Sequence, residues 1–152
     1  MKQSLYLEDL HVGQKFTSGT TLVTEEAIKE FAGKYDPQPF HLDDDAAKST
    51  LFGGLAASGW HTAAITMHLN VSSGPPLAGG IVGGGGEIHW PTPTRPGDIL
   101  RVEGEVKEIT PSRSKPDRGM IVMRMETKNQ NDEVRQMIVM KLIVPRRPAA
   151  TA

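Results

Sequence analysis

SGWHTAAITMHLN (Ser58–Asn70) is the stretch that decides the fold, because it carries the strongest helical pattern in the chain. Five apolar residues recur at the spacing of one helix face: Trp60, Ala63, Ala64, Met67 and Val71. This spacing predicts a helix with one buried apolar stripe. Ser58 is suited to cap its first turn, and Gly59 follows inside that turn. Small residues on the helix allow close packing, so we expect a central helix lying on a sheet.

The sequence after this helix changes to the alternation of apolar and polar residues that is typical of strands. Strands are expected at 100–107, 121–127 and 134–144, with a shorter one near 86–90. Asn129–Asp132 suits a hairpin turn between the last two strands. The glycine run Gly83–Gly86 lacks the Lys-Ser/Thr of a phosphate-binding loop. We interpret it as a bulge or as the close approach of another backbone.

Two short helices are expected before the central helix. Thr24 can cap a helix over 24–32 with acids in its first turn, and Gly33 can end it. A second helix should start at one of the three acids in 43–45. Between the two helices lies YDPQPFH (35–41), which the two prolines should hold outside regular structure. This segment therefore presents one carboxylate and one imidazole on a stiff loop, as proton transfer requires.

The bulk properties favour a single soluble domain. The chain has 152 residues, no cysteine and a net charge of −1, which excludes a disulfide scaffold and a cysteine nucleophile. The chain carries no excess of positive charge, so neither nucleic acid nor a membrane surface is an expected partner. We expect one domain over 1–145, a flexible tail over 146–152 and, from the lack of an apolar leader or membrane span, a cytoplasmic location.

The start of the central helix is a second candidate site. Its first backbone N–H groups have no acceptor inside the helix, and the helix dipole adds positive potential there. They can hold a carbonyl oxygen as it gains charge, and Gly59 has no side chain to block an approaching thioester or ester. The alternative is that Gly59 only eases entry into the helix. Histidines that could be imagined as metal ligands are His41, His61, His68 and His89, but packing roles are commoner, so no metal is expected.

These motifs, in their order along the chain, resemble the MaoC-like dehydratases, also called (R)-specific enoyl-CoA hydratases. The resemblance rests on Asp36–His41, on Ala46–Ala47 and on Gly59. Trp90–Asp98 looks like the family's Pro-x-x-Pro-Gly-Asp turn, and Pro111–Gly119 is similar to a stretch in some members. The resemblance implies an α+β hotdog fold, in which a curved antiparallel sheet wraps a long helix and short helices form an overhang segment before it. It also implies a homodimer or a larger homo-oligomer.

The activity that the resemblance implies is the reversible hydration of a trans-2-enoyl thioester to a 3-hydroxyacyl thioester, in fatty acid metabolism and without a cofactor. Asp36 and His41 would position and deprotonate the water, while the Gly59 N–H would polarise the carbonyl. The carrier could be coenzyme A or an acyl carrier protein. The residues expected to bind substrate are Gln38, Phe40, Ser58, Trp60, Arg113, Lys115 and Arg118. Arg113, Lys115 and Arg118 could bind phosphates, such as those of coenzyme A, or they could form a solvated basic loop.

Two positions depart from the family pattern. Gln38 replaces the usual Asn, and Ser58 replaces the usual His before Gly59. Two other functions stay open: a hotdog acyl-CoA thioesterase and a non-catalytic acyl-CoA-binding protein. The spacing of Asp36 and His41 argues against the thioesterase.

Overall fold

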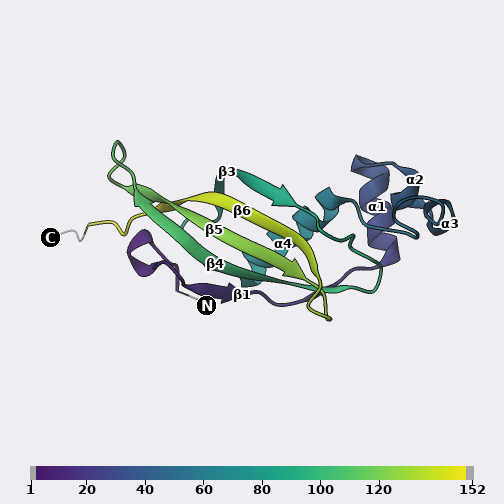
Figure 1. Ribbon diagram of the computed structural model, residues 1–152. Coiled ribbons are helices and arrows are strands. Elements are labelled where there is room, and N and C mark those ends of the chain that lie inside the picture. The colour runs from purple at the N-terminus through teal and green to yellow at the C-terminus, as the bar shows by residue number, and fades with distance from the viewer. Residues whose placement is uncertain (1–2, 150–152) are drawn as a thin grey trace.

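The structure is a computed structural model that describes residues 3–149. Its elements follow in the order η1 Leu7–Asp9, β1 Lys15–Thr17, β2 Thr21–Leu22, α1 Glu25–Tyr35, α2 Pro39–Leu42, α3 Asp44–Ala47, α4 Gly59–Ser73, β3 Val82–His89, β4 Ile99–Pro111, β5 Arg118–Lys128 and β6 Val134–Pro145. The antiparallel sheet has the order β1-β4-β5-β6-β3, with β2 also paired to β4. Figure 1 shows the sheet curving past α4, with α1 to α3 at one end. The expected hotdog fold is confirmed.

The glycine run lies in the first half of β3, which pairs with β6 from Val82 to His89. The register between the two strands shifts between Gly83 and Gly85, which is the expected bulge. A Cβ placed on Gly86 would overlap the carbonyl oxygen of Val139, so the backbones do approach closely there. Within residues 3–149, no second strand pairs with β3 on its other side. This edge of the sheet therefore presents an exposed backbone.

The burial predicted for the central helix is wrong. Ser58 caps α4 as expected, but the apolar stripe faces outward: Trp60 is 61% exposed, Met67 46% and Val71 68%. The residues that α4 buries are His61, Thr62, Thr66, Leu69 and Asn70. This polar face can be buried because the sheet offers it hydrogen-bond partners. The Thr127 hydroxyl, for example, lies 2.6 Å from that of Thr66. Buried hydroxyls that bond each other escape the cost of lost hydration.

The short helices also differ in detail from the predictions. Thr24 caps α1 by accepting from the N–H of Ala27, but the helix continues through Gly33. The segment after it is not wholly irregular, because Pro39 opens the four-residue helix α2; proline suits a first helical position. Asp43 caps α3, as one of the three acids was expected to do. The short elements before α1 were not anticipated, since two or three residues carry no readable period.

The core is one cluster between the sheet and the helices, reaching from Leu7 through Ile28 to Val144. The expected division into a domain over 1–145 and a flexible tail stays a prediction. Arg146 donates its N–H to the Asp117 carbonyl, 2.8 Å away, and Arg147 pairs with Asp9. The end of the expected tail, residues 150–152, lies outside the described residues. No helix in the described part of the chain is long and apolar enough to cross a membrane.

Candidate active site

His41 is held in one orientation and one tautomer. Its Nδ1 lies 2.6 Å from the carbonyl oxygen of Ala56, and since a carbonyl can only accept, Nδ1 carries a proton. The other ring nitrogen, Nε2, lies 3.3 Å from Oδ2 of Asp36. Phe40 packs edge-on against the imidazole at 4.6 Å between ring centroids. The buried imidazole therefore directs Nε2 toward the carboxylate.

Asp36 ends α1 and keeps its carboxylate partly exposed. The Gln38 amide donates to Oδ1 over 2.6 Å. Burial alone would raise the pKa of Asp36, but hydrogen bonding from the Gln38 and Ser58 side chains and the charge of His41 outweigh it and leave the pKa below its usual 3.8. Asp36 is therefore ionised at neutral pH. Gln38 and Ser58, the two departures from the family pattern, both act on this carboxylate.

The first turn of α4 lies beside this pair. The Ser58 side chain accepts from the N–H of Trp60 at 3.3 Å, and the Ser58 carbonyl accepts from the N–H groups of His61 and Thr62. Among residues 3–149, the N–H of Gly59 donates to no protein acceptor. The first N–H groups of any α-helix have no acceptor within the helix, and the N–H of Gly59 is one of them. A ligand oxygen could take it up.

His41 and Gly59 line the same cleft, which has a volume of about 220 Å³. Its other walls are Phe52, Ala57, Thr62, Trp90, Pro91, Thr92, Pro93, Thr94 and Arg135. The indole of Trp90 lies directly against Gly59, because a Cβ at that position would come within 2.7 Å of the ring. The close approach of Trp90 therefore requires glycine at this position.

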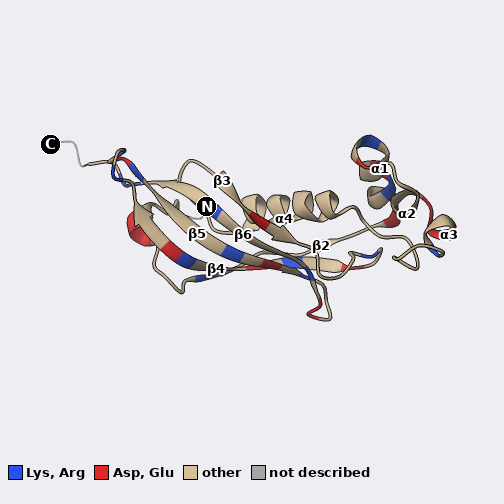
Figure 2. Cartoon of the chain, turned by 45° about the horizontal axis from the view of Figure 1, so that its top comes forward, with Lys and Arg blue, Asp and Glu red and all other residues tan. Residues whose placement is uncertain are grey.

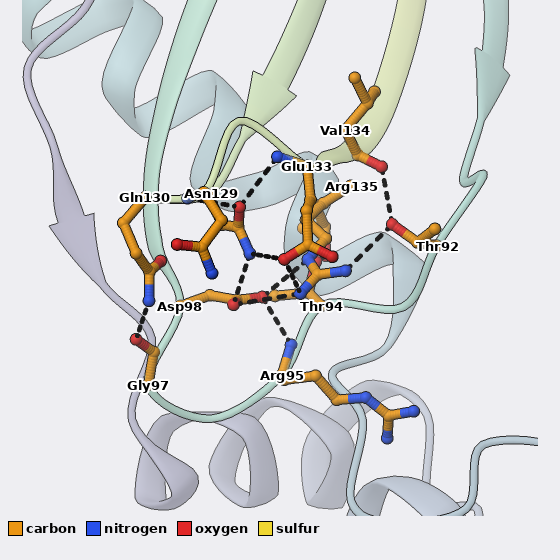
Figure 3. Close-up of polar contacts among 12 residues, drawn as sticks. Thr92, Thr94, Arg95, Gly97, Asp98, Asn129, Gln130, Glu133, Val134 and Arg135 are labelled. Atoms are coloured by element: carbon orange, nitrogen blue, oxygen red, sulfur yellow. Dashed lines mark hydrogen bonds and ion pairs between the residues drawn. The ribbon is translucent and has the colours of Figure 1, made fainter.

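One wall of the cleft is fixed by a buried ion pair (Figure 3). Arg135 donates to both carboxylate oxygens of Asp98, at 2.9 and 3.2 Å, and also to the Thr92 hydroxyl. Burial would raise the pKa of Asp98, but hydrogen bonds from Arg135, the Arg95 N–H and Asn129 outweigh it and lower the pKa below 3.8. Sequence reasoning singled out the turn that contains Asp98 but missed Arg135, whose charge at the start of an apolar strand was the available signal.

Arg95 connects this wall to the segment before α4. Its guanidinium donates to the carbonyl oxygens of Gly54, at 2.9 Å, and of Phe52. The Thr94 carbonyl accepts from the N–H of Ala57 at 2.9 Å. These bonds fix the segment whose Ala56 carbonyl orients His41. Arg95 was not predicted as a site residue, because the carbonyls that it binds leave no mark in a sequence.

The structure brings together only part of the predicted site. Of the predicted residues, His41 and Gly59 line the cleft. Asp36 and Phe40 contact His41, and Gln38 and Ser58 act on Asp36. The ring of Trp60 lies 5.2 Å from that of Trp90. Arg113, Lys115 and Arg118 belong to the β4–β5 hairpin at the opposite end of the sheet from α1 to α3 (Figure 1, Figure 2). β4 has 13 residues and is about 40 Å long. Within one chain, the hairpin and the Asp36/His41 pair are therefore apart.

The remaining histidine of interest, His61, packs in the interior. Its ring stacks on Phe31 with 4.8 Å between centroids, and its buried Nδ1 has no hydrogen-bond partner among residues 3–149. Burial lowers the pKa of His61 below 6.5. In the part of the chain that the structure describes, no three His, Cys, Asp or Glu residues are placed to share a metal ion.

Comparison with known proteins identifies the family. Residues 9–129 match the model of the MaoC like domain. The chain belongs to this family. A Rhodospirillum rubrum MaoC-like dehydratase of known crystal structure is 59% identical, with a TM-score of 0.94 over 96% of this chain and all of that one. The (R)-hydratase PhaJ1 of Pseudomonas aeruginosa is 25% identical, with a TM-score of 0.74 over 98% of this chain and 94% of the other.

Curated relatives of this MaoC-like protein include one with a named activity. The 3-hydroxybutyryl-CoA dehydratase of Methylorubrum extorquens is 35% identical over 115 residues, which are 72% of this chain and 68% of the relative. The uncharacterised protein YdeM of Bacillus subtilis is 32% identical over 129 residues, 83% of this chain and 89% of its own length. Family membership is thus clear, whereas named relatives span both a dehydratase and a protein without a known activity.

Proposed function

We propose that this protein is a hydro-lyase that reversibly hydrates a trans-2-enoyl thioester to the 3-hydroxyacyl thioester. The observation that carries the proposal is the Asp36/His41 pair, 3.3 Å apart, beside a cleft that also contains the free N–H of Gly59. The dehydratase and (R)-hydratase among the relatives support the same reaction and favour the (R) product. Coenzyme A is the carrier that we propose.

The acid and base roles follow from the hydrogen bonds. Because the Nδ1 proton of His41 is held by Ala56, only Nε2 is free to exchange a proton with water or with Asp36. The ionised Asp36 and Nε2 together orient a water and accept its proton as its oxygen bonds to C3 of the enoyl group. The pair then returns a proton to C2. In dehydration the same groups remove the C2 proton and protonate the departing hydroxyl.

Gly59 would stabilise the charge that develops at the other end of the conjugated system. Attack at C3 moves electrons onto the thioester oxygen, so a donor placed at that oxygen lowers the barrier. Within residues 3–149 the Gly59 N–H donates to no acceptor, and it lies at the positive end of a 15-residue helix. Phe40 would support His41 from behind, and Trp60 would border the entrance.

A homodimer would complete the binding site. β3 is an edge strand of the sheet, and α4 exposes the apolar side chains of Trp60, Met67 and Val71. A second copy of the chain could pair with the edge strand and cover these side chains. We propose pairing of β3 with β3 of a second subunit about a two-fold axis. The two strands then run in opposite directions. This places the β4–β5 hairpin of one subunit at the same end as the cleft of the other.

In such a dimer the basic hairpin gains a role that one chain cannot give it. β3 runs from Val82, which pairs with Ile143 near the hairpin end, to His89, next to the cleft. Arg113, Lys115 and Arg118 of one subunit would therefore meet the phosphates of a thioester bound to the other. A depression of about 570 Å³ beside Arg113 and Arg118 offers room for part of the carrier.

The proposal is tested by incubating the protein separately with trans-2-butenoyl-CoA and with butyryl-CoA. Hydration predicts that the absorbance of the conjugated double bond disappears without release of thiol, and that butyryl-CoA stays intact. Release of thiol from both substrates would identify a thioesterase instead. Binding that raises the melting temperature without any turnover would identify a non-catalytic acyl-CoA-binding protein. Chiral analysis of the hydroxy acid tests the (R) assignment.

A further inference from the structure

Trp90 stands where the cleft meets the interior between α4 and the sheet. It directly follows β3, and its indole N–H donates to Oε1 of Gln136 at 2.9 Å. One face of the ring lies against Gly59, and Trp60 packs edge-on against it at an interplanar angle of 81°. The indole is thus fixed on several sides, although 38% of Trp90 is exposed.

The anchor of Trp90 is itself part of a buried network. Gln136 is completely buried, and its amide donates to the Thr66 hydroxyl at 3.0 Å. The single hydrogen of that hydroxyl goes to the Thr62 carbonyl, so Thr66 accepts from both Gln136 and Thr127. The network joins α4, β5 and β6. Fully satisfied buried networks are rigid, so Gln136 offers Trp90 a fixed support.

Trp90 and the network that holds it lie between two spaces. On one side lies the cleft with His41 and Gly59, to which Thr62 and Trp90 contribute. On the other side, Thr66 and Gln136 border a small interior space of about 60 Å³, whose remaining walls are largely apolar and rich in methionine: Ala63, Met67, Asn70, Pro75, Ile81, Gly83, Met123, Met125, Ile138, Met140 and Leu142. Methionine side chains adapt readily to added volume. An acyl chain could therefore extend into this space if the barrier were absent.

We propose that Trp90, held by Gln136, ends the acyl site and restricts the protein to short acyl chains. The inference rests on the proposed function, because it assumes that the thioester carbonyl sits at Gly59. The cleft of about 220 Å³ agrees with it, since sites for drug-sized ligands have volumes of about 300–1,000 Å³. Trp90 is thus a specificity-determining residue, and the bulk of its ring limits the length of the acyl chain that the site accepts.

The test compares kcat/KM for trans-2-butenoyl-CoA and trans-2-octenoyl-CoA. The wild type should favour the four-carbon substrate, and Trp90→Ala should raise the ratio of octenoyl to butenoyl by about tenfold or more, because one well-placed methylene is worth about 10–200-fold. Trp90→Phe is the matched control, since it keeps an aromatic ring and should keep most of the preference. An unchanged ratio in folded Trp90→Ala would overturn the inference.

Two further measurements keep the result decisive. If Trp90→Ala fails to fold, Trp90→Leu replaces it, and Gln136→Leu should shift the ratio in the same direction by releasing the indole. Calorimetric binding of butyryl-CoA and octanoyl-CoA needs no chemistry. A wild type that hydrates neither enoyl-CoA but binds the shorter chain better would refute the proposed function alone. Equal binding of both chains by wild type and Trp90→Ala would refute the chain-length inference alone.

Discussion

The Nδ1 of His41 lies 2.6 Å from the carbonyl oxygen of Ala56, and the N–H of Ala56 in turn lies 3.1 Å from the carbonyl of Phe40. Two hydrogen bonds thus clamp α2 to the segment that leads into α4. The clamp fixes the ring orientation that points Nε2 at Asp36. It also explains how a histidine in a four-residue helix can hold a reproducible position.

The first prediction concerns the two residues of the acid–base pair. Asp36→Asn and His41→Gln should each lower kcat for butenoyl-CoA hydration by about 10²–10⁴-fold, the usual scale for losing a general acid or base. KM should change less, because neither group is needed to hold the carrier. Steady-state kinetics on each purified variant gives both numbers, and circular dichroism checks the fold.

Glu30→Gln is the matched control for this pair. Glu30 is another acid of α1, but its side chain is 72% exposed and, within the described part of the chain, pairs with Lys34 alone. Its activity should stay that of the wild type. Near-normal turnover in either Asp36→Asn or His41→Gln would remove the basis of the proposed mechanism.

The second prediction concerns the contact of Gly59 with Trp90. Gly59→Ala should destabilise the protein by about 1–3 kcal/mol, the range for overpacking, because the new methyl group would collide with the indole. In a Trp90→Ala background the same change should cost much less. The two substitutions are therefore expected to be coupled, as urea unfolding of the four proteins of the cycle can measure. Additive losses would show that the indole does not lie on Gly59 in solution.

The third prediction concerns the buried Asp98/Arg135 pair. Asp98→Asn should lower the free energy of unfolding at pH 7 by about 3 kcal/mol, because it removes the buried counter-charge of Arg135 and leaves only the exposed carboxylate of Glu133, 3.8 Å away. Asp117→Asn removes an exposed aspartate paired with Arg118 and should have little effect. Denaturant titration of the three proteins gives the comparison.

The cost of Asp98→Asn should also depend on pH. The pKa of Asp98 is lower in the folded protein than in the unfolded chain, so its stabilising effect is complete above the unfolded value of about 3.9. It is lost as the pH falls through the folded pKa. The gap between wild type and Asp98→Asn should therefore narrow below about pH 4. A gap of constant size would mean that the carboxylate charge is not what stabilises Arg135.

The sequence predicted the architecture because long periodic segments carry strong signals. The central helix begins at its predicted cap, and the three long strands of the second half overlap the segments predicted for them. The short strand expected near 86–90 begins earlier, at Val82, because it includes the glycine run. The face that the helix buries could not be predicted in the same way. The apolar pattern of Trp60, Met67 and Val71 marks a face that needs a cover, but it does not say whether that cover is the sheet of the same chain.

The candidate site divides along similar lines. Asp36 and His41 could be singled out because they are close in sequence and carry their chemistry in their side chains. Trp90 and Arg95 could not, since their roles depend on a glycine face and on backbone carbonyls that only the fold brings near. The Arg113 hairpin lies apart from Asp36 within one chain, because a suitable charge pattern does not say which end of the sheet it occupies. Its expected contact with phosphates stays a prediction that depends on a second subunit.

The fourth prediction concerns the unpartnered His61 ring. Burial lowers the pKa of His61 in the folded state, so its neutral form contributes stability that is complete above about pH 6.5 and lost as the pH falls through the folded pKa. His61→Phe keeps an aromatic ring against Phe31 and removes the buried Nδ1. Between about pH 7.5 and pH 5, the melting temperature of this variant should fall less than that of the wild type. Parallel pH profiles would argue against a buried neutral His61.

The last prediction concerns the proposed dimer. Analytical ultracentrifugation should give about 33 kDa, twice the 16.5 kDa of one chain. Arg113→Glu combined with Arg118→Glu should raise KM for butenoyl-CoA, because like charges then face the phosphates. A subunit with these two substitutions in its hairpin still contains intact Asp36 and His41. An Asp36→Asn subunit, in contrast, still contains an intact hairpin.

Mixing the two variants tells which subunit the hairpin serves. If it acts on the cleft of the partner, a mixed dimer has one cleft with wild-type Asp36 and a wild-type hairpin opposite it. Random exchange of subunits should then restore about a quarter of the wild-type activity at low substrate, since half of the dimers are mixed and half of their sites are complete. If the hairpin served its own cleft, no complete site would form. Restoration on mixing would thus show that two chains build each site, and its absence in an exchanging dimer would refute that arrangement. An unchanged KM in the Arg113→Glu/Arg118→Glu variant would instead assign the hairpin to the solvent.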